Sequence, residues 1–227
     1  MPGMPGWLDR AVVNCLITLC IVVTPVPNSS SLVQVKKAAR SCTNCPLWKN
    51  ATQTVFGEGK SSAKILIVGE QPGDQEDRAG RPFVGPAGKL LDRALEEAGI
   101  NRQETYVTNA VKHFKWEPVG KRRLHKKPSA REVAACRPWL EAEIRIIRPT
   151  IVVCLGATAA AALLGPKVRV LRDRGRVFSS VLAGSILITI HPSLLLRITD
   201  REEAAEKYLH FVADLRAAAS KARNALK

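Results

Sequence analysis

The sequence predicts an α/β fold, a three-layer helix-sheet-helix sandwich around a short, mainly parallel four-stranded sheet. Two observations predict it. Four short segments are apolar and rich in β-branched residues, as strands buried on both faces of a sheet are, and helical patterns lie between them. The predicted strands are residues 64–69, 105–108, 151–155 and 185–190. Right-handed crossovers would place the four strands parallel.

Helical signals fill the gaps between these strands. Leu90, Leu91, Ala94 and Leu95 recur at helical spacing, and Gly99 marks a stop. Ser129 followed by Glu132 forms a capping box, which opens a helix that reaches about residue 147. The predicted helices are residues 32–40, 88–98, 130–147, 157–164 and 202–222.

The composition predicts one globular domain behind an amino-terminal extension. The chain has 227 residues, of which 46% are hydrophobic and 24% charged, values typical of a single folded domain. A polar break at 28–31 indicates a disordered or weakly structured extension over 1–31 and a domain over 32–227. The apolar stretch 11–23 is too short to span a bilayer and lacks a signal-peptide cleavage pattern. We therefore expect a cytoplasmic protein without a membrane partner, with export as the less favoured alternative.

The charge points to a nucleic-acid partner. Lys and Arg number 35 against 20 Asp and Glu, a formal net charge of +15, which favours a polyanionic ligand. Basic residues gather between 112 and 127, where Glu117 is the one acid: Lys112, Lys115, Lys121, Arg122, Arg123, Lys126 and Lys127. Contacts of these residues with several phosphates would make binding salt-sensitive.

Polar residues follow three of the four predicted strands. Ligands of parallel sheets bind beyond the carboxyl ends of the strands, so these residues are the candidate site. They are Glu70, Gln71 and Asp74 after the first strand, Asn109 after the second, and His191 and Ser193 after the fourth. The glycine-rich turn after the first strand matches neither the dinucleotide nor the Walker pattern, and the chain has no Gly-x-Ser-x-Gly elbow. Dinucleotide, nucleoside-triphosphate and acyl-transfer chemistry are therefore disfavoured.

The motifs at these strand ends resemble one known family. The loop 69–88 is similar to the first motif of the uracil-DNA glycosylase superfamily, in its iron-sulfur, family-four-like branch. Val107-Thr108-Asn109 and His191-Pro192-Ser193 resemble its uracil-reading and leaving-group motifs, and the resemblance covers roughly residues 42–215. The segment 120–125, Gly-Lys-Arg-Arg-Leu-His, resembles the basic loop of the UdgX branch, whose members become covalently attached to uracil-containing DNA. Leu124 departs from its usual isoleucine.

The resemblance implies a role for each residue of the uracil pocket. Uracil leaves as an anion, so the site needs an amide, a stacking ring and a hydrogen-bond donor. Asn109 would pair with the base edge, Phe83 would stack on it, and His191, next to Ser193, would donate to its carbonyl oxygen. Gln71 would fill the space of a hydrolytic water. Core packing remains the alternative for Phe83, as a capped core histidine does for His191.

The resemblance also makes His125 the nucleophile that captures the sugar after uracil departs. Imidazole attacks when neutral, and neighbouring cations favour that form by lowering its pKa. Glu70 or Asp74 would accept its other proton, while Lys121, Arg122, Arg123 and Lys126 would contact DNA. Without the resemblance, His125 is one more member of a solvated DNA-facing loop.

Three of the cysteines indicate a metal site. The pair Cys42-x-x-Cys45 leaves a cluster half ligated, and Cys136 supplies a third thiol. Related iron-sulfur glycosylases have Lys-Cys after the second strand, where this chain has Lys112-His113, so the resemblance implies an iron-sulfur cluster, [4Fe-4S], with His113 as fourth ligand. Cys154 is the rival ligand, and zinc is the rival metal.

We therefore expect a DNA-repair glycosylase that excises uracil, releases it as the free base and then bonds to the abasic deoxyribose through His125. We expect it to be a monomer that prefers single-stranded DNA. A conventional turnover glycosylase is the alternative, and a non-catalytic iron-sulfur nucleic-acid-binding protein is the third hypothesis.

Overall fold

A six-stranded sheet forms the centre of the computed structural model, which describes residues 24–225. Its strand order is β1-β3-β2-β6-β8-β7, and the middle four strands run parallel. The strands are β1 (Glu58–Gly59), β2 (Ile65–Gly69), β3 (Tyr106–Asn109), β6 (Ile151–Leu155), β7 (Val177–Ser180) and β8 (Gly184–Thr189). The predicted parallel strands and sandwich are confirmed. The antiparallel edge strands β1 and β7 were not predicted, because β1 is two residues long and β7 is partly exposed.

The five predicted helices are all present, with ends within two residues of the prediction. They are α1 (Leu32–Ala39), α3 (Pro86–Glu97), α4 (Ala130–Ile147), α5 (Ala157–Leu164) and α8 (Arg201–Asn224). The Ser129–Glu132 capping box opens α4 as expected. Shorter helices are α2 (Asp74–Ala79), α6 (Val170–Asp173) and α7 (Pro192–Leu195), with 3-10 turns η1 (Pro46–Lys49) and η2 (Arg102–Glu104).

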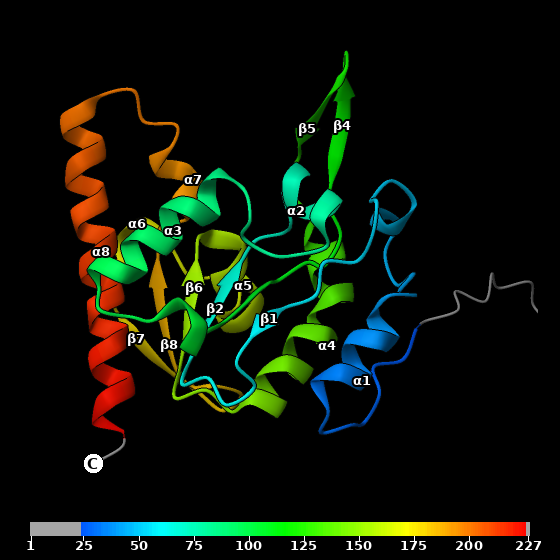
Figure 1. Cartoon of the computed structure of the whole chain (residues 1–227), viewed down its shortest axis with the longest axis horizontal. Coiled ribbons are helices and arrows are strands. Elements are labelled where there is room, and N and C mark those ends of the chain that lie inside the picture. Colours follow the sequence, from blue (N-terminus) through cyan, green and yellow to red (C-terminus); the bar gives the residue numbers. More distant parts are fainter. Residues whose placement is uncertain (1–23, 226–227) are drawn as a thin grey trace, which may run out of the picture.

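Alternate residues of each parallel strand enter opposite cores. Ile65 and Ile67 of β2 pack in the core that α3 and α8 cover, whereas Leu66 and Val68 pack against α4 and α5. Figure 1 shows these helices on the two sides of the sheet. This two-sided burial explains why the strands are continuous apolar runs.

A β-hairpin stands clear of this body (Figure 1). It pairs β4 (Trp116–Val119) with β5 (Arg122–His125) as a separate antiparallel sheet, and Gly120 occupies its turn at φ 57°. The sequence analysis treated this segment as a loop. Its high charge and Pro118 disfavour a strand in a packed sheet, but an exposed two-stranded ribbon tolerates both.

Residues before α1 contact the body of the chain. Thr24 accepts a hydrogen bond at its carbonyl from the Asn44 amide (2.9 Å), and Val26 packs near α1. Residues Thr24 and Val26 therefore contact the domain, while the apolar stretch 11–23 lies outside the described residues. Among the helices of residues 24–225, none is long and apolar enough to cross a membrane.

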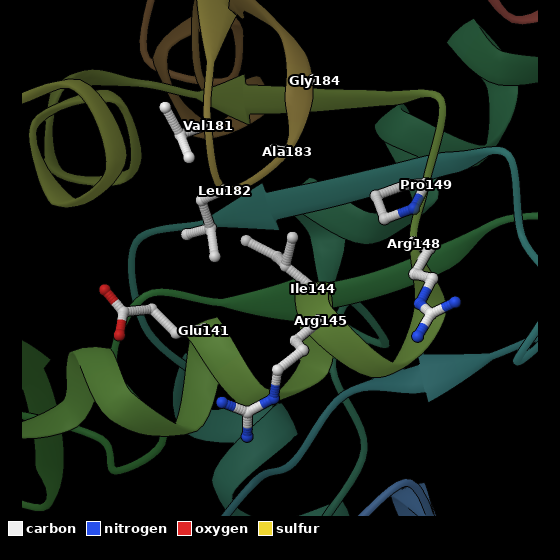
Figure 2. Close-up of a pocket in the computed structure, with 9 residues that line it drawn as sticks. All are labelled: Glu141, Ile144, Arg145, Arg148, Pro149, Val181, Leu182, Ala183 and Gly184. Atoms are coloured by element: carbon white, nitrogen blue, oxygen red, sulfur yellow. The ribbon is translucent and has the colours of Figure 1, made fainter.

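A surface hollow of about 430 Å³ lies where α4 ends, beside the turn between β7 and β8 (Figure 2). Ile144, Arg145 and Arg148 line one side and Val181 and Leu182 the other. This is the amino end of the parallel strands, so the hollow is separate from the polar residues at their carboxyl ends.

Candidate active site

The carboxyl ends of β2 and β3 bring Asn109 and Phe83 together. Gly69 is the register partner of Asn109. A Cβ at Gly69 would overlap both the Asn109 amide oxygen and the Phe83 ring. Glycine at the end of β2 therefore allows the amide and the ring to approach each other.

Phe83 has a strained backbone. Its φ is 58°, in the left-handed region that residues other than glycine rarely adopt. Its ring stacks on His191 with centroids 6.3 Å apart and planes at 27°. The residue also belongs to the core that α3 and α8 cover, so it lies where the core meets the candidate pocket. Strain of this kind persists where surrounding structure enforces it, and it clusters at ligand sites.

His191 is held as a neutral imidazole. Its Nδ1 accepts the Ser193 backbone N–H at 3.1 Å and lies 2.8 Å from the Ser193 hydroxyl. Burial lowers the pKa of His191 to about 4, helped by His125 and Arg197. Because Nδ1 is an acceptor, the ring proton is on Nε2. The side chain therefore has one N–H donor left for a ligand.

His125 ends β5 and faces Glu70. Its Nε2 lies 3.6 Å from Glu70 Oε1, and the other Glu70 oxygen accepts the Thr158 hydroxyl. The Phe114 ring packs 6.0 Å from the imidazole, centroid to centroid. Burial lowers the pKa of His125, although the Glu70 carboxylate opposes that shift. The imidazole is therefore neutral near pH 7 and has a carboxylate beside it.

Asp74, the other carboxylate considered for His125, belongs to a different network. It pairs with Arg78 (3.0 Å) and with Arg123. Arg123 also donates to the fully buried Asp77 at 2.6 Å and to the Thr52 hydroxyl at 3.1 Å. Its guanidinium lies over the Phe114 and Trp116 rings as well. These contacts attach the hairpin to α2.

The four predicted DNA contacts differ in their surroundings. Lys121 and Arg122 are exposed near the tip of the hairpin. Lys126 pairs with Glu117 at 2.9 Å. The Arg123 side chain is only 13% exposed and points toward α2, so in this structure it is engaged with protein carboxylates.

Gln71 clamps the base of the hairpin. Its buried amide donates to the backbone carbonyls of Lys126 (3.0 Å) and Lys115 (3.2 Å) and accepts the Lys115 N–H (3.2 Å). One side chain thus bonds both strands of the hairpin where they leave the body.

Three cysteines gather in one buried cluster. Cys42 and Cys45 follow α1, and Cys136 lies on α4. The Trp139 indole donates to Cys42 Sγ (3.2 Å) and the Lys112 N–H to Cys136 Sγ (3.1 Å). The rival ligand Cys154 packs elsewhere, in the core against α4 and α5.

The fourth expected ligand is less clearly placed. His113 is buried, and its Nε2 lies 2.9 Å from the Thr54 hydroxyl. Within residues 24–225, no group of three or more His, Cys, Asp or Glu side chains is arranged to hold a metal ion. The structure therefore assembles the three thiols in one region without arranging all four expected ligands around a common point.

Sequence reasoning missed two side chains of this site. Thr158 lies in the first turn of α5, three residues beyond the β6 strand end, so extending the strand-end search by one helical turn would have found it. Arg197 donates to the Ser193 carbonyl (3.0 Å) and depresses the pKa of both His125 and His191. No sequence signal distinguished it from other surface arginines.

Comparison with known proteins gives consistent matches. The profile of the Uracil DNA glycosylase superfamily matches residues 56–216. A type-4 uracil-DNA glycosylase of Thermotoga maritima is 42% identical over 169 residues, 74% of this chain and 84% of the relative. A type-4 enzyme of Pyrobaculum aerophilum is 38% identical over 73% of this chain and 85% of its own length. A type-4 enzyme of Archaeoglobus fulgidus is 34% identical, with 78% and 88% covered.

Proposed function

This chain belongs to the uracil DNA glycosylase superfamily, and we propose that it excises uracil and then stays bonded to the abasic site through His125. The activity itself is base excision, cleavage of the N-glycosidic bond of uracil in DNA, the reaction for which the type-4 uracil-DNA glycosylase relatives are named. The observation that carries the covalent step is the neutral His125 beside Glu70, close enough to His191 to lower the pKa of that residue.

The pocket residues suit the departure of uracil. The Asn109 amide would pair with the polar edge of the flipped base, and the Phe83 ring would stack on its face. As the bond between C1′ and N1 breaks, its electron pair stays on uracil. The Nε2–H of His191 would stabilise the charge at the uracil carbonyl oxygen, with Ser193 keeping the ring in that tautomer. Free uracil would then be the released product.

His125 would complete the reaction at the sugar. One imidazole nitrogen would give its lone pair to C1′ of the cation-like deoxyribose, forming an N–C bond. The proton of the other nitrogen would pass to Glu70, whose second oxygen is held by Thr158. Among the two carboxylates considered, the geometry supports Glu70, because Asp74 is engaged by two arginines.

The hairpin contacts support a positioning role for Gln71 and Arg123. Both attach the hairpin to the body, Gln71 at its base and Arg123 against α2. His125 follows Arg123 by two residues, so these contacts would hold the imidazole near the pocket. The exposed Lys121 and Arg122 would contact phosphates, with Lys126 able to do so after leaving Glu117.

We propose that Cys42, Cys45 and Cys136, with His113, hold an iron-sulfur cluster of the [4Fe-4S] type. The thiol-rich donor set fits such a cluster, and N–H donors already face two of the sulfurs, as they do around cluster thiolates. The cluster would join the segment after α1 to α4 and to the loop that follows Asn109. Brown protein that absorbs at about 400 nm is expected, while colourless protein with stoichiometric zinc would refute the proposal.

We also propose that the protein acts as a monomer in the cytoplasm and prefers single-stranded DNA. The exposed basic residues Lys121 and Arg122 support contact with the backbone of an unpaired strand. Excision rates on single- and double-stranded substrates of one sequence would test this preference.

One denaturing gel tests the covalent step. The protein is incubated with uracil-containing single-stranded DNA, and we expect a shifted band that resists denaturant. Alkali-cleavable free DNA would instead identify a turnover glycosylase. Unchanged DNA would contradict both.

A further inference from the structure

A fully buried ion pair lies behind the end of β3. Lys112 Nζ donates to Glu143 Oε2 at 2.5 Å, and the two side chains are 1% and 0% exposed. Glu143 belongs to α4, and Lys112 to the loop after β3. Apolar residues of similar volume often stabilise a core as well as or better than such a pair. Packing alone is therefore a weak reason for this pair.

Lys112 also holds the backbone of Asn109. Its Nζ donates to the Asn109 carbonyl at 2.8 Å and to the Thr108 hydroxyl at 2.6 Å. Asn109 is 3% exposed, so its carbonyl would otherwise be buried without this donor, which is unfavourable. The ammonium group thus fixes the peptide unit that carries the Asn109 side chain.

Glu143 connects this contact to its surroundings. Its carboxylate accepts the Tyr106 hydroxyl (2.9 Å), the Thr108 hydroxyl (3.0 Å) and the Gly57 backbone N–H (3.0 Å). Every partner is buried or in β3 itself, and connected buried networks of this kind are rigid when all members are satisfied. The network therefore restrains the end of β3, which carries Asn109.

We propose that Lys112 and Glu143 are positioning residues for base recognition: they hold Asn109 in the orientation that reads uracil. The inference rests on the proposed role of Asn109. The amide must meet the base edge in one geometry, and a misplacement of about 1 Å in such a site reduces rate by about 100-fold. Neither residue touches the base.

The test is the double variant K112M/E143Q, which removes both charges and leaves no buried charge unpaired. Uracil release is measured in a single turnover, so the result does not depend on adduct formation. We expect release to fall about 10- to 100-fold and inhibition by free uracil to weaken in parallel. Affinity for uracil-free DNA should stay unchanged, because no phosphate contact is removed.

Thr105→Val is the matched control. It removes a buried hydroxyl that precedes β3 and donates to the Arg102 carbonyl, and it leaves the Lys112–Glu143–Asn109 contacts in place, so it should lower the melting temperature while excision and uracil inhibition stay within about twofold. A folded double variant with wild-type excision and uracil inhibition would overturn the proposal.

Two further variants keep the outcome decisive. If the double variant does not fold, Thr108→Val removes the hydroxyl between the two charges and should weaken both readouts by about 2- to 10-fold; no change would overturn the proposal. Asn109→Asp separates the hypotheses. If that variant keeps full excision, the assignment of the uracil reader fails; if it loses excision while K112M/E143Q does not, only the positioning role fails.

Discussion

The sheet edge and the β4–β5 hairpin support the two halves of the site by different means. Asn109 is the last residue of β3, and His191 follows the end of β8. The apolar residues of these strands enter the cores on both sides of the sheet. His125 ends a strand of an exposed ribbon that is attached through side chains of Gln71 and Arg123. If the proposed roles hold, base recognition rests on rigid backbone, whereas capture of the sugar rests on a hairpin attached by side chains. Variants should therefore be able to separate uracil release from adduct formation.

The largest expected effect is at His125. His125→Ala should abolish the covalent adduct, because a methyl group has no lone pair for C1′, while uracil release persists at a reduced rate. His125→Ser leaves room for water and should give a turnover glycosylase. The readout is a denaturing gel alongside a uracil-release assay. His210→Ala, on the exposed face of α8, is the control, and a stable adduct in His125→Ala would contradict the assignment.

Next in size is Asn109→Asp, which tests the sheet half. A second acceptor in place of the amide donor should repel uracil O4 and accept the cytosine amine. Sites that hydrogen-bond a polar edge discriminate by up to about 10⁴, so most uracil excision should be lost, with a trace gained on cytosine. Asn101→Asp is the matched control: it makes the same change outside the site, its side-chain oxygen can still cap η2, and excision should not change. Undiminished excision by Asn109→Asp would mean that the base binds elsewhere.

Loosening the β4–β5 hairpin should slow formation of the covalent adduct more than it slows release of uracil. Gln71→Ala removes three hydrogen bonds to the hairpin backbone, and displacement of His125 should slow adduct formation by about 10- to 100-fold. Uracil release should change less. The comparison is with Gln75→Ala, an exposed glutamine of α2. Equal losses in both steps would show that the hairpin and the sheet act as one unit.

The smallest effect is a shift in pH dependence. Burial depresses the pKa of His125 below its usual value of about 6.5, so the neutral form already predominates at that pH and is lost as pH falls through the lowered value. The rate of adduct formation should therefore have a midpoint below pH 6.5. Because the Glu70 carboxylate raises this pKa, Glu70→Gln should move the midpoint lower still and slow the step. Glu96→Gln on α3 should leave the midpoint in place, and a midpoint above 6.5 in the wild type would contradict the interpretation.

Local patterns were sufficient for most of the fold. The runs at 64–69 and 151–155 are strands because their residues are buried on both faces, and the Ser129 capping box starts α4. The hairpin was missed because its strands satisfy neither pattern: their residues are charged, and their pairing depends on anchors far away in the sequence. Gln71 supplies one of those anchors from the loop after β2, and Asp77 supplies another from α2.

The sandwich, its parallel strand ends and the family motifs could be predicted from the sequence, because apolar periodicity and turn chemistry are local properties. Three features emerged only from the folded chain: which carboxylate faces His125, which way Arg123 points, and the contact of Lys112 with Asn109. Each of these contacts joins side chains from different elements. Their energies depend on burial and distance between atoms, and no spacing along the chain encodes these quantities.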